Sequence, residues 1–105
     1  MSTGEAYFHV DLDADTDPVR VVARGELDAA SALQLTEQLE VAHRADKGID
    51  LDLGGVTFID SSGLRVIATE LGRAETTGLT FSVSSASEPV RRIFEVTGFT
   101  DVIVS

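Results

Sequence analysis

The sequence predicts an α/β sandwich in which a mixed sheet of four to five strands is packed with three or more helices. Short apolar segments with the two-residue period of strands alternate along the chain with longer segments whose apolar residues recur at helical spacing. The first two strand segments follow each other closely, which predicts an antiparallel hairpin. The later strands are separated by helices, so the rest of the sheet is expected to be largely parallel.

The N-terminal hairpin is predicted from two apolar segments on either side of an acidic turn. Ala6, Phe8 and Val10 alternate with polar residues, and Val19 to Ala23 form the second segment. Asp13 to Pro18 is the turn, because proline interrupts strand pairing and aspartate favours turns. The turn is acidic enough to suggest a calcium-binding loop. It lacks the glycine and the terminal glutamate of such a loop, so we expect no metal site there.

The first helix is expected to follow a turn at Gly25 to Asp28. Asp28 is its predicted N-cap, because an aspartate oxygen accepts hydrogen bonds from the free amides of the first helical turn. Gly48 is its predicted C-terminal stop. The apolar face of this helix has the spacing of a buried stripe and consists of Ala32, Leu35, Leu39 and Ala42.

The central part of the chain leads from a strand into a helix. Ile49 to Leu53 have the period of a half-buried strand, Gly54-Gly55 interrupts the pattern, and Val56 to Ile59 follow. Asp60 to Ser62 therefore lie where a strand and loop give way to a helix start. The apolar stripe of the helix, expected to face the sheet, consists of Leu64, Ile67, Ala68 and Leu71.

The C-terminal part of the chain predicts one more strand and one more helix. Gly78 ends the preceding helix, and Leu79 to Val83 form the strand. Ser87 to Pro89 predict a helix start, with a serine cap followed by an acid and a proline, and Gly98 is its stop. Val102 to Val104 fit either a short final strand or a packed tail, and the sequence leaves both open. The apolar face of the last helix consists of Val90, Ile93 and Phe94.

Length and composition limit the classes of function. We expect one domain spanning all 105 residues, with a core over about residues 6–104. Cysteine is absent, which excludes disulfides and thiolate metal sites and fits a reducing cytoplasm. We find no secretory signal and no apolar segment near the roughly 20 residues that span a bilayer, so a soluble cytoplasmic protein is expected.

The net charge of −10 argues against binding to nucleic acid or to a membrane, because both carry negative charge. A protein partner with a basic or apolar face is more compatible with this surface. The acidity could equally serve only solubility, and composition does not separate the two.

The helix start at Asp60 and Ser61 has chemical consequences. Both residue types are favoured caps, and capping alone would account for them. The free amides and the helix dipole also favour an anion at this end. A phosphoryl group on Ser61, with its charge of about −1.5 to −2, would therefore be tolerated without melting the helix.

Three segments of the chain resemble one known family. Val56 to Leu64 resembles the signature of the STAS domain, and specifically that of the bacterial anti-sigma-factor antagonists. Arg24 to Asp28 resembles the family's segment between its second strand and first helix, and Phe94 to Phe99 resembles the end of its C-terminal helix. The matches occur in the right order over about residues 6–104, which is far more specific than a single serine motif.

The resemblance implies a non-enzymatic anti-sigma-factor antagonist that is switched by phosphorylation. In the family, the first serine after the aspartate is phosphorylated by an anti-sigma factor that is also a kinase. That serine is Ser61 here, and Ser62 is the second candidate. The unphosphorylated protein would bind the kinase and release the sigma factor, and phosphorylation would abolish the complex. The implied partner-binding residues are Glu26, Asp28, Thr57, Asp60, Ser61, Ser62, Gly63 and Arg65.

The resemblance bears on cofactors, and the predicted helix faces bear on assembly. ATP and magnesium would bind the kinase, so no cofactor is expected in this chain, and a serine phosphatase usually restores the serine in the family. The acidic helix residues expected to face solvent are Glu37, Glu40 and Glu70. An acidic dimer seam is therefore disfavoured, and a monomer is expected.

Some of the implied binding residues have a purely structural alternative. Asp28 also suits a helix cap. Gly63 either gives the partner access to the backbone or only avoids crowding in the first turn. The charge of Arg65 either selects the partner or is simply solvated.

Two other functions remain as alternatives. The first is a non-phosphorylated STAS scaffold or transporter-associated interaction module, in which Ser61 is only a cap. The second is a small hydrolase, which is disfavoured because the Gly-x-Ser-x-Gly motif is absent and neither His9 nor His43 is expected beside Ser61. The chain also lacks a phosphate-binding Gly-x-x-x-x-Gly-Lys loop. Its single lysine, Lys47, argues against a receiver domain that is phosphorylated on aspartate.

Overall fold

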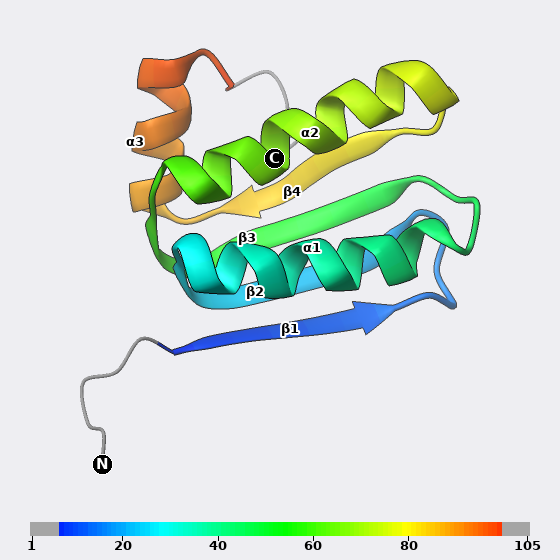
Figure 1. Ribbon diagram of the computed structural model, residues 1–105, viewed down its shortest axis with the longest axis horizontal. Helices are drawn as coiled ribbons and strands as arrows, with labels where there is room; N and C mark the ends of the chain where they lie inside the picture. Colours follow the sequence, from blue (N-terminus) through cyan, green and yellow to red (C-terminus); the bar gives the residue numbers. More distant parts are fainter. Residues whose placement is uncertain (1–6, 100–105) are drawn as a thin grey trace.

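The computed structural model describes residues 7–99, which form one mixed four-stranded sheet and three helices (Figure 1). The strand order is β1-β2-β3-β4, with β1 antiparallel to β2 and the other neighbours parallel. The predicted fold class is therefore confirmed. The segment Val102 to Val104 lies outside the described residues. The elements are β1 (Phe8–Asp13), β2 (Val19–Leu27), α1 (Ala29–His43), β3 (Ile49–Ile59), α2 (Ser61–Thr77), β4 (Phe81–Ala86) and α3 (Glu88–Thr97).

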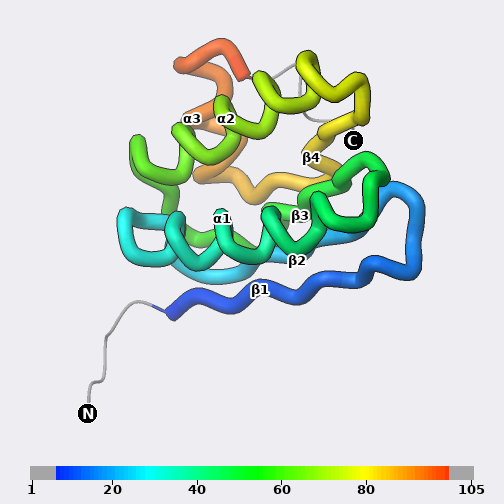
Figure 2. The backbone as a smooth tube through the Cα atoms, turned by 45° about the vertical axis from the view of Figure 1, so that its right-hand side comes forward, coloured from blue at the N-terminus to red at the C-terminus, as the bar shows by residue number. Residues whose placement is uncertain are grey.

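The two longer helices lie side by side on one face of the sheet. α1 covers β1 and β2, and α2 lies over β3 and β4 (Figures 1 and 2). α3 packs against β3 near the start of α2. Because β2, β3 and β4 are parallel, their carboxyl ends meet at one edge of the sheet, and α1 and α2 both begin there.

The core lies between this helix layer and the sheet. Every second residue of β2 is buried, and α1 buries the four apolar residues predicted for it. α3 contributes Phe94, whose ring meets that of Phe99 edge to face at 5.9 Å between centroids. The other sheet face is polar, and Arg20 on β2 there pairs with Asp50 at 3.3 Å and Asp52 at 2.7 Å on β3.

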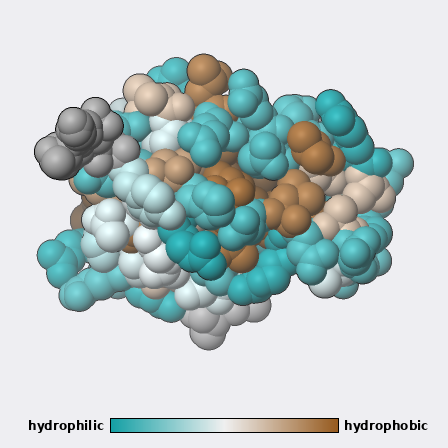
Figure 3. Space-filling model, turned by 90° about the horizontal axis from the view of Figure 1, so that it is seen from below, coloured by the Kyte–Doolittle hydropathy of each residue, from teal (hydrophilic) through white to brown (hydrophobic). Residues whose placement is uncertain are grey.

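The edge strand β1 is less buried than its neighbours. Phe8, Val10 and Leu12 point toward the core but remain half-buried, while the residues between them are exposed. The view from the side of β1 shows a mainly hydrophilic surface with apolar residues gathered near its middle (Figure 3). The short N-terminal strand is thus confirmed, with the alternation expected for a strand at an edge.

Several strands run farther than the sequence predicts, including β4, which is Phe81–Ala86 rather than Leu79–Val83. β2 continues through Gly25 to Leu27 rather than turning at Gly25. Gly25 has a φ of +106°, and a Cβ there would lie 1.9 Å from the carbonyl oxygen of Tyr7, so only glycine lets the strand continue past β1. β3 also runs through Gly54-Gly55, where a register shift against β2 accommodates both residues.

Helix ends agree with the predictions except at two positions. Gly78 and Gly98 end α2 and α3 in left-handed conformations, as predicted. α1 ends at His43, with Arg44 as its C-cap, rather than at Gly48, which instead lies against Thr80. Ser87 occupies the N-cap position of α3, but its hydroxyl donates a hydrogen bond to the carbonyl oxygen of Val56 instead of capping the helix.

The buried face of α2 differs from the predicted stripe. Ala68 is exposed and Leu71 is only half-buried, so the prediction was wrong at Ala68. Glu70, expected in solvent, is 4% exposed, and its Oε1 lies 2.8 Å from Nε2 of His43 on α1. α2 packs against α1 as well as against the sheet. Its buried residues therefore lie about one position earlier in the sequence than the predicted stripe. The buried residues of α2 are Gly63, Val66, Ile67 and Glu70.

Candidate functional site

At the start of α2, Ser61 lies between the N-cap residue Asp60 and the buried Gly63. Asp60 is the N-cap, and its Oδ1 accepts hydrogen bonds from the amides of Ser62 at 2.8 Å and Gly63 at 3.4 Å. Ser61 is the first residue of the helix and is exposed. Within residues 7–99 its hydroxyl has no hydrogen-bond partner, so it is available to another molecule.

The strand ends hold this helix start in place. The amide of Asp60 donates to the carbonyl oxygen of Leu27 at 3.2 Å, which joins the end of β3 to the end of β2. Leu27 and Ile59, the last residues of the two strands, are buried. Ser61 therefore projects from a rigid edge of the sheet, where open α/β sheets usually place functional groups.

Gly63 faces inward rather than outward. It is buried, and a Cβ at this position would lie 2.8 Å from side-chain carbons of both Leu27 and Ile59. The missing side chain thus lets the first turn of α2 approach the sheet closely. A contact between Gly63 and a partner stays a prediction.

The start of α1 lies at the same edge and is held by a capping box. The carboxylate of Asp28 accepts from the amide of Ser31 at 3.1 Å, and the Ser31 hydroxyl accepts from the amide of Asp28 at 2.8 Å. The same hydroxyl donates to the carbonyl oxygen of Glu26 at 2.6 Å. Hydrogen bonds from the backbone and side chain of Ser31 lower the pKa of Asp28, which stays a carboxylate. Asp28 therefore does cap α1, the structural role considered for it in the sequence analysis.

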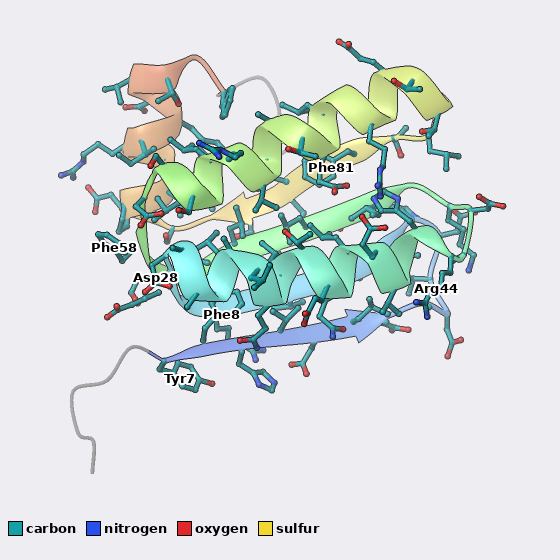
Figure 4. The ribbon with its side chains drawn as sticks, in the orientation of Figure 1. Tyr7, Phe8, Asp28, Arg44, Phe58 and Phe81 are labelled. Atoms are coloured by element: carbon teal, nitrogen blue, oxygen red, sulfur yellow. The ribbon has the colours of Figure 1, made fainter. Side chains whose placement is uncertain are left out.

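The structure brings most of the predicted site residues to this edge. Glu26 lies near the end of β2 and pairs with Phe58 on β3, and Thr57 precedes Phe58. Glu26 and Thr57 are exposed. Figure 4 shows Asp28 and Phe58 at the end of the molecule where α1 and α2 begin.

Two apolar residues of this edge escaped the sequence analysis. Phe58 is 48% exposed and Leu33, on α1, is 67% exposed. Leu33 does not share the helical spacing of the buried α1 face, and Phe58 sits at an outward position of its strand. The sequence did carry a signal for such exposed residues, namely an apolar residue that lies outside the buried stripe of its helix or strand.

A groove of about 460 Å³ separates α1 from α2 beside Ser61. Leu33, Ser62 and Arg65 line it together with Glu40 and Glu70. The two acids have basic partners, because Glu40 pairs with Arg73 at 3.0 Å and Glu70 pairs with His43. Arg65 is exposed and, within the described part of the chain, has no ion pair or hydrogen bond.

Within residues 7–99, the Ser61 hydroxyl has no hydrogen-bonded base that could activate it for hydrolysis. His43 ends α1, at the opposite end from the start of α2, and is bound to Glu70. His9 lies on β1 and pairs with Asp11 at 3.0 Å. Neither histidine is beside Ser61, as a hydrolytic triad would require. Over residues 7–99, no group of three or more His, Asp or Glu side chains is arranged to hold a metal ion.

The helices between residues 7 and 99 include none with the length and hydropathy to cross a membrane.

The chain matches one protein family and is similar to several known proteins. A family model described as "Mlab, STAS domain" matches residues 10–105. The "Anti-sigma-B factor antagonist" of Listeria monocytogenes is 33% identical over 93 residues, which covers 87% of this chain and 81% of that protein. The protein of the same name from Bacillus subtilis is 32% identical over 98 residues, covering 91% of this chain and 88% of the relative.

Solved structures show the same fold. The anti-sigma factor antagonist SpoIIAA in its unphosphorylated form has a TM-score of 0.78 at 21% identity, with 91% of this chain and 86% of that chain covered. The Bacillus cell fate determinant SpoIIAA in the phosphorylated form has a TM-score of 0.70 at 22% identity, with coverage of 91% and 89%.

Proposed function

Because the chain belongs to the STAS family and is one of its non-enzymatic anti-sigma-factor antagonists, we propose that Ser61 is a phosphorylation switch that controls binding to a kinase anti-sigma factor. The observation that carries this proposal is the exposed Ser61 hydroxyl, which has no partner within residues 7–99 and stands at the rigid edge where α1 and α2 begin. The unphosphorylated protein binds the anti-sigma factor and thereby frees the sigma factor.

The surface around Ser61 supports binding of a protein partner. Leu33 and Phe58 expose apolar area that gains free energy when a partner covers it. The groove between α1 and α2 offers a concave place for a side chain of that partner. Polar residues surround these apolar anchors, which is the usual anatomy of an interface. The proposed rim consists of Glu26, Asp28, Thr57, Asp60, Ser62 and Arg65.

Phosphotransfer is the work of the partner in this proposal. The kinase supplies ATP and magnesium, and the Ser61 oxygen attacks the γ-phosphorus in line with the leaving ADP oxygen. A new O–P bond forms, the bond from the γ-phosphorus to the β,γ-bridging oxygen breaks, and the hydroxyl proton passes to a base of the kinase. Ser61 needs only to be accessible and held in a fixed position, which its place on α2 provides.

Phosphorylation then opposes binding by electrostatics and desolvation. A phosphoserine carries about −1.5 to −2 charges and is strongly hydrated, so burying it in an interface is costly. The carboxylate of Asp60, which caps the helix beside Ser61, adds repulsion within an already acidic protein. A cost of about 3 kcal/mol would lower the affinity more than a hundredfold.

The cellular setting of the proposal is the cytoplasm, where ATP is available to the kinase. The antagonist acts as a monomer, and a serine phosphatase resets Ser61. Ser62 is half-buried and lines the groove, so it is the less accessible of the two candidate serines.

The proposal is tested by incubating the protein with ATP, magnesium and candidate kinase anti-sigma factors from the same genome. Intact-mass measurement should show one added phosphate, and peptide mapping should place it on Ser61. The Ser62→Ala variant should accept the phosphate and the Ser61→Ala variant should not. A folded protein that gains no phosphate from any candidate would instead support a constitutive binding module.

A further inference from the structure

We propose that Arg65 binds the phosphate of phosphorylated Ser61 and holds it against the first turns of α2. Arg65 is thus a positioning residue for the modified serine. This inference rests on the proposed phosphorylation of Ser61, and it assigns Arg65 a role in the phosphorylated state in addition to its proposed place in the rim of the interface.

The positions of the two residues favour the contact. Ser61 and Arg65 are four residues apart on α2, a spacing that brings the Cβ atoms of a helix to about 5–6 Å. An acidic group on the N-terminal side of a basic one is the better of the two orientations. Helical side chains lean toward the N-terminus, so Arg65 extends over the first turn. Its place in the groove beside Ser62 agrees with this direction.

Arg65 is available for a phosphate. It has no ion pair or hydrogen bond within residues 7–99. The two carboxylates that line the same groove are already engaged, since Glu40 pairs with Arg73 and Glu70 with His43. A guanidinium with a free fork of donors matches the geometry of a phosphate.

Most of the backbone amides at the start of α2 already have acceptors. The amides of Ser62 and Gly63 already donate to the Asp60 carboxylate, and the amide of Leu64 donates to the Asp60 carbonyl oxygen. These three amides of the first turn are therefore occupied, which leaves fewer backbone donors for an anion. Asp60 also places a negative charge beside the phosphate, so a cation on the same helix has a specific compensating effect.

Contact with Arg65 fixes the phosphate on Ser61 and favours its doubly charged form. A cation near the phosphate favours the dianion over the monoanion and so lowers the second pKa of the phosphoserine. The phosphate is held at the mouth of the groove between α1 and α2, since Arg65 lines that groove. Phosphorylation then adds charge and also obstructs the groove.

The test compares three full-length proteins in which phosphoserine is incorporated at position 61 during translation, so that no kinase is needed. They are the otherwise unchanged protein, Arg65→Gln and Arg44→Gln. Arg44→Gln removes the same charge from an exposed arginine at the opposite end of α1, which Figure 4 shows far from the helix starts. The measurement is a pH titration of the phosphorus NMR shift.

Arg65→Gln is expected to raise the phosphate pKa by about 0.15 to 0.4 units relative to the unchanged sequence, and Arg44→Gln is expected to leave it unchanged. All three proteins should titrate alike in concentrated urea, where the helix is absent. Equal pKa values for the folded Arg65→Gln and unchanged proteins would overturn the inference. That result would leave the kinase proposal standing, whereas failure of kinase transfer to Ser61 would overturn the proposed function without altering this titration.

Discussion

The Oδ1 atom of Asp60 lies 2.8 Å from the amide nitrogen of Ser62, across the residue that is proposed to carry the phosphate. The cap therefore fixes the backbone on both sides of Ser61 while the Ser61 hydroxyl stays unengaged within the described chain. A rigid backbone with an accessible side chain is what an in-line attack on ATP requires. The same carboxylate later repels the phosphate, so one residue contributes to both states of the switch.

Removing the cap should destabilise the protein without unfolding it. Asp60→Ala is expected to lower the free energy of unfolding by about 1 kcal/mol, because two amides of the first turn lose their acceptor. Asp60→Asn should cost clearly less, since asparagine caps helices nearly as well. Urea titrations of the two variants measure the difference, and equal losses would show that capping is not the role of Asp60 in stability.

Two glycines of α2 should respond to alanine in opposite directions. Gly63→Ala is expected to cost about 1–3 kcal/mol, because the new methyl group meets Leu27 and Ile59. Gly72→Ala is expected to stabilise by about 0.5–1 kcal/mol, because a Cβ there has no neighbour within 4 Å among the described residues. Chemical denaturation of both variants checks this, and a Gly63→Ala protein as stable as the parent would contradict the inward packing.

The exposed Leu33 should matter for partner binding and not for folding. Leu33→Asp is expected to weaken binding of the anti-sigma factor by about tenfold, because an apolar contact is replaced by a charge that must be desolvated. Val41→Asp is the control, since Val41 is also exposed on α1 but lies two turns farther from the start of the helix. Calorimetric titration gives both affinities. If the two variants bind equally, the groove is not part of the interface.

The buried Glu70 should contribute to stability through His43. Glu70→Ala is expected to cost about 1–3 kcal/mol, because the ring nitrogen of His43 loses its partner between α1 and α2. Glu37→Ala, an exposed change on α1, should stay within about 0.5 kcal/mol of the parent. Thermal and urea unfolding report both values, and a Glu70→Ala protein as stable as Glu37→Ala would show that the pair adds nothing.

The strand-to-helix transition at Asp60 was predictable because its signals are local. A strand period, a capping residue and a helical stripe follow each other within a few residues, and the structure places α2 from Ser61 onward as expected. The cap at Asp28 and the stops at Gly78 and Gly98 were predictable for the same reason.

The burial of Glu70 was not predictable from its own helix. A glutamate is rarely buried unless paired, and its partner, His43, lies 27 residues away on α1. The extension of β2 past Gly25 likewise depends on the carbonyl oxygen of Tyr7, just before β1, which accepts a hydrogen bond from the amide of Glu26. The groove beside Ser61 arises only when α1 and α2 lie together, so no local pattern indicates it.

The most direct test of the central claim is the affinity of the cognate anti-sigma factor for the protein before and after phosphorylation of Ser61, measured by calorimetric titration. We expect the unphosphorylated protein to bind and the phosphorylated protein to bind more than about a hundredfold more weakly. The Ser62→Ala variant should show the same loss on phosphorylation. Equal affinity of the two phosphorylation states would contradict the account of Ser61 as the switch.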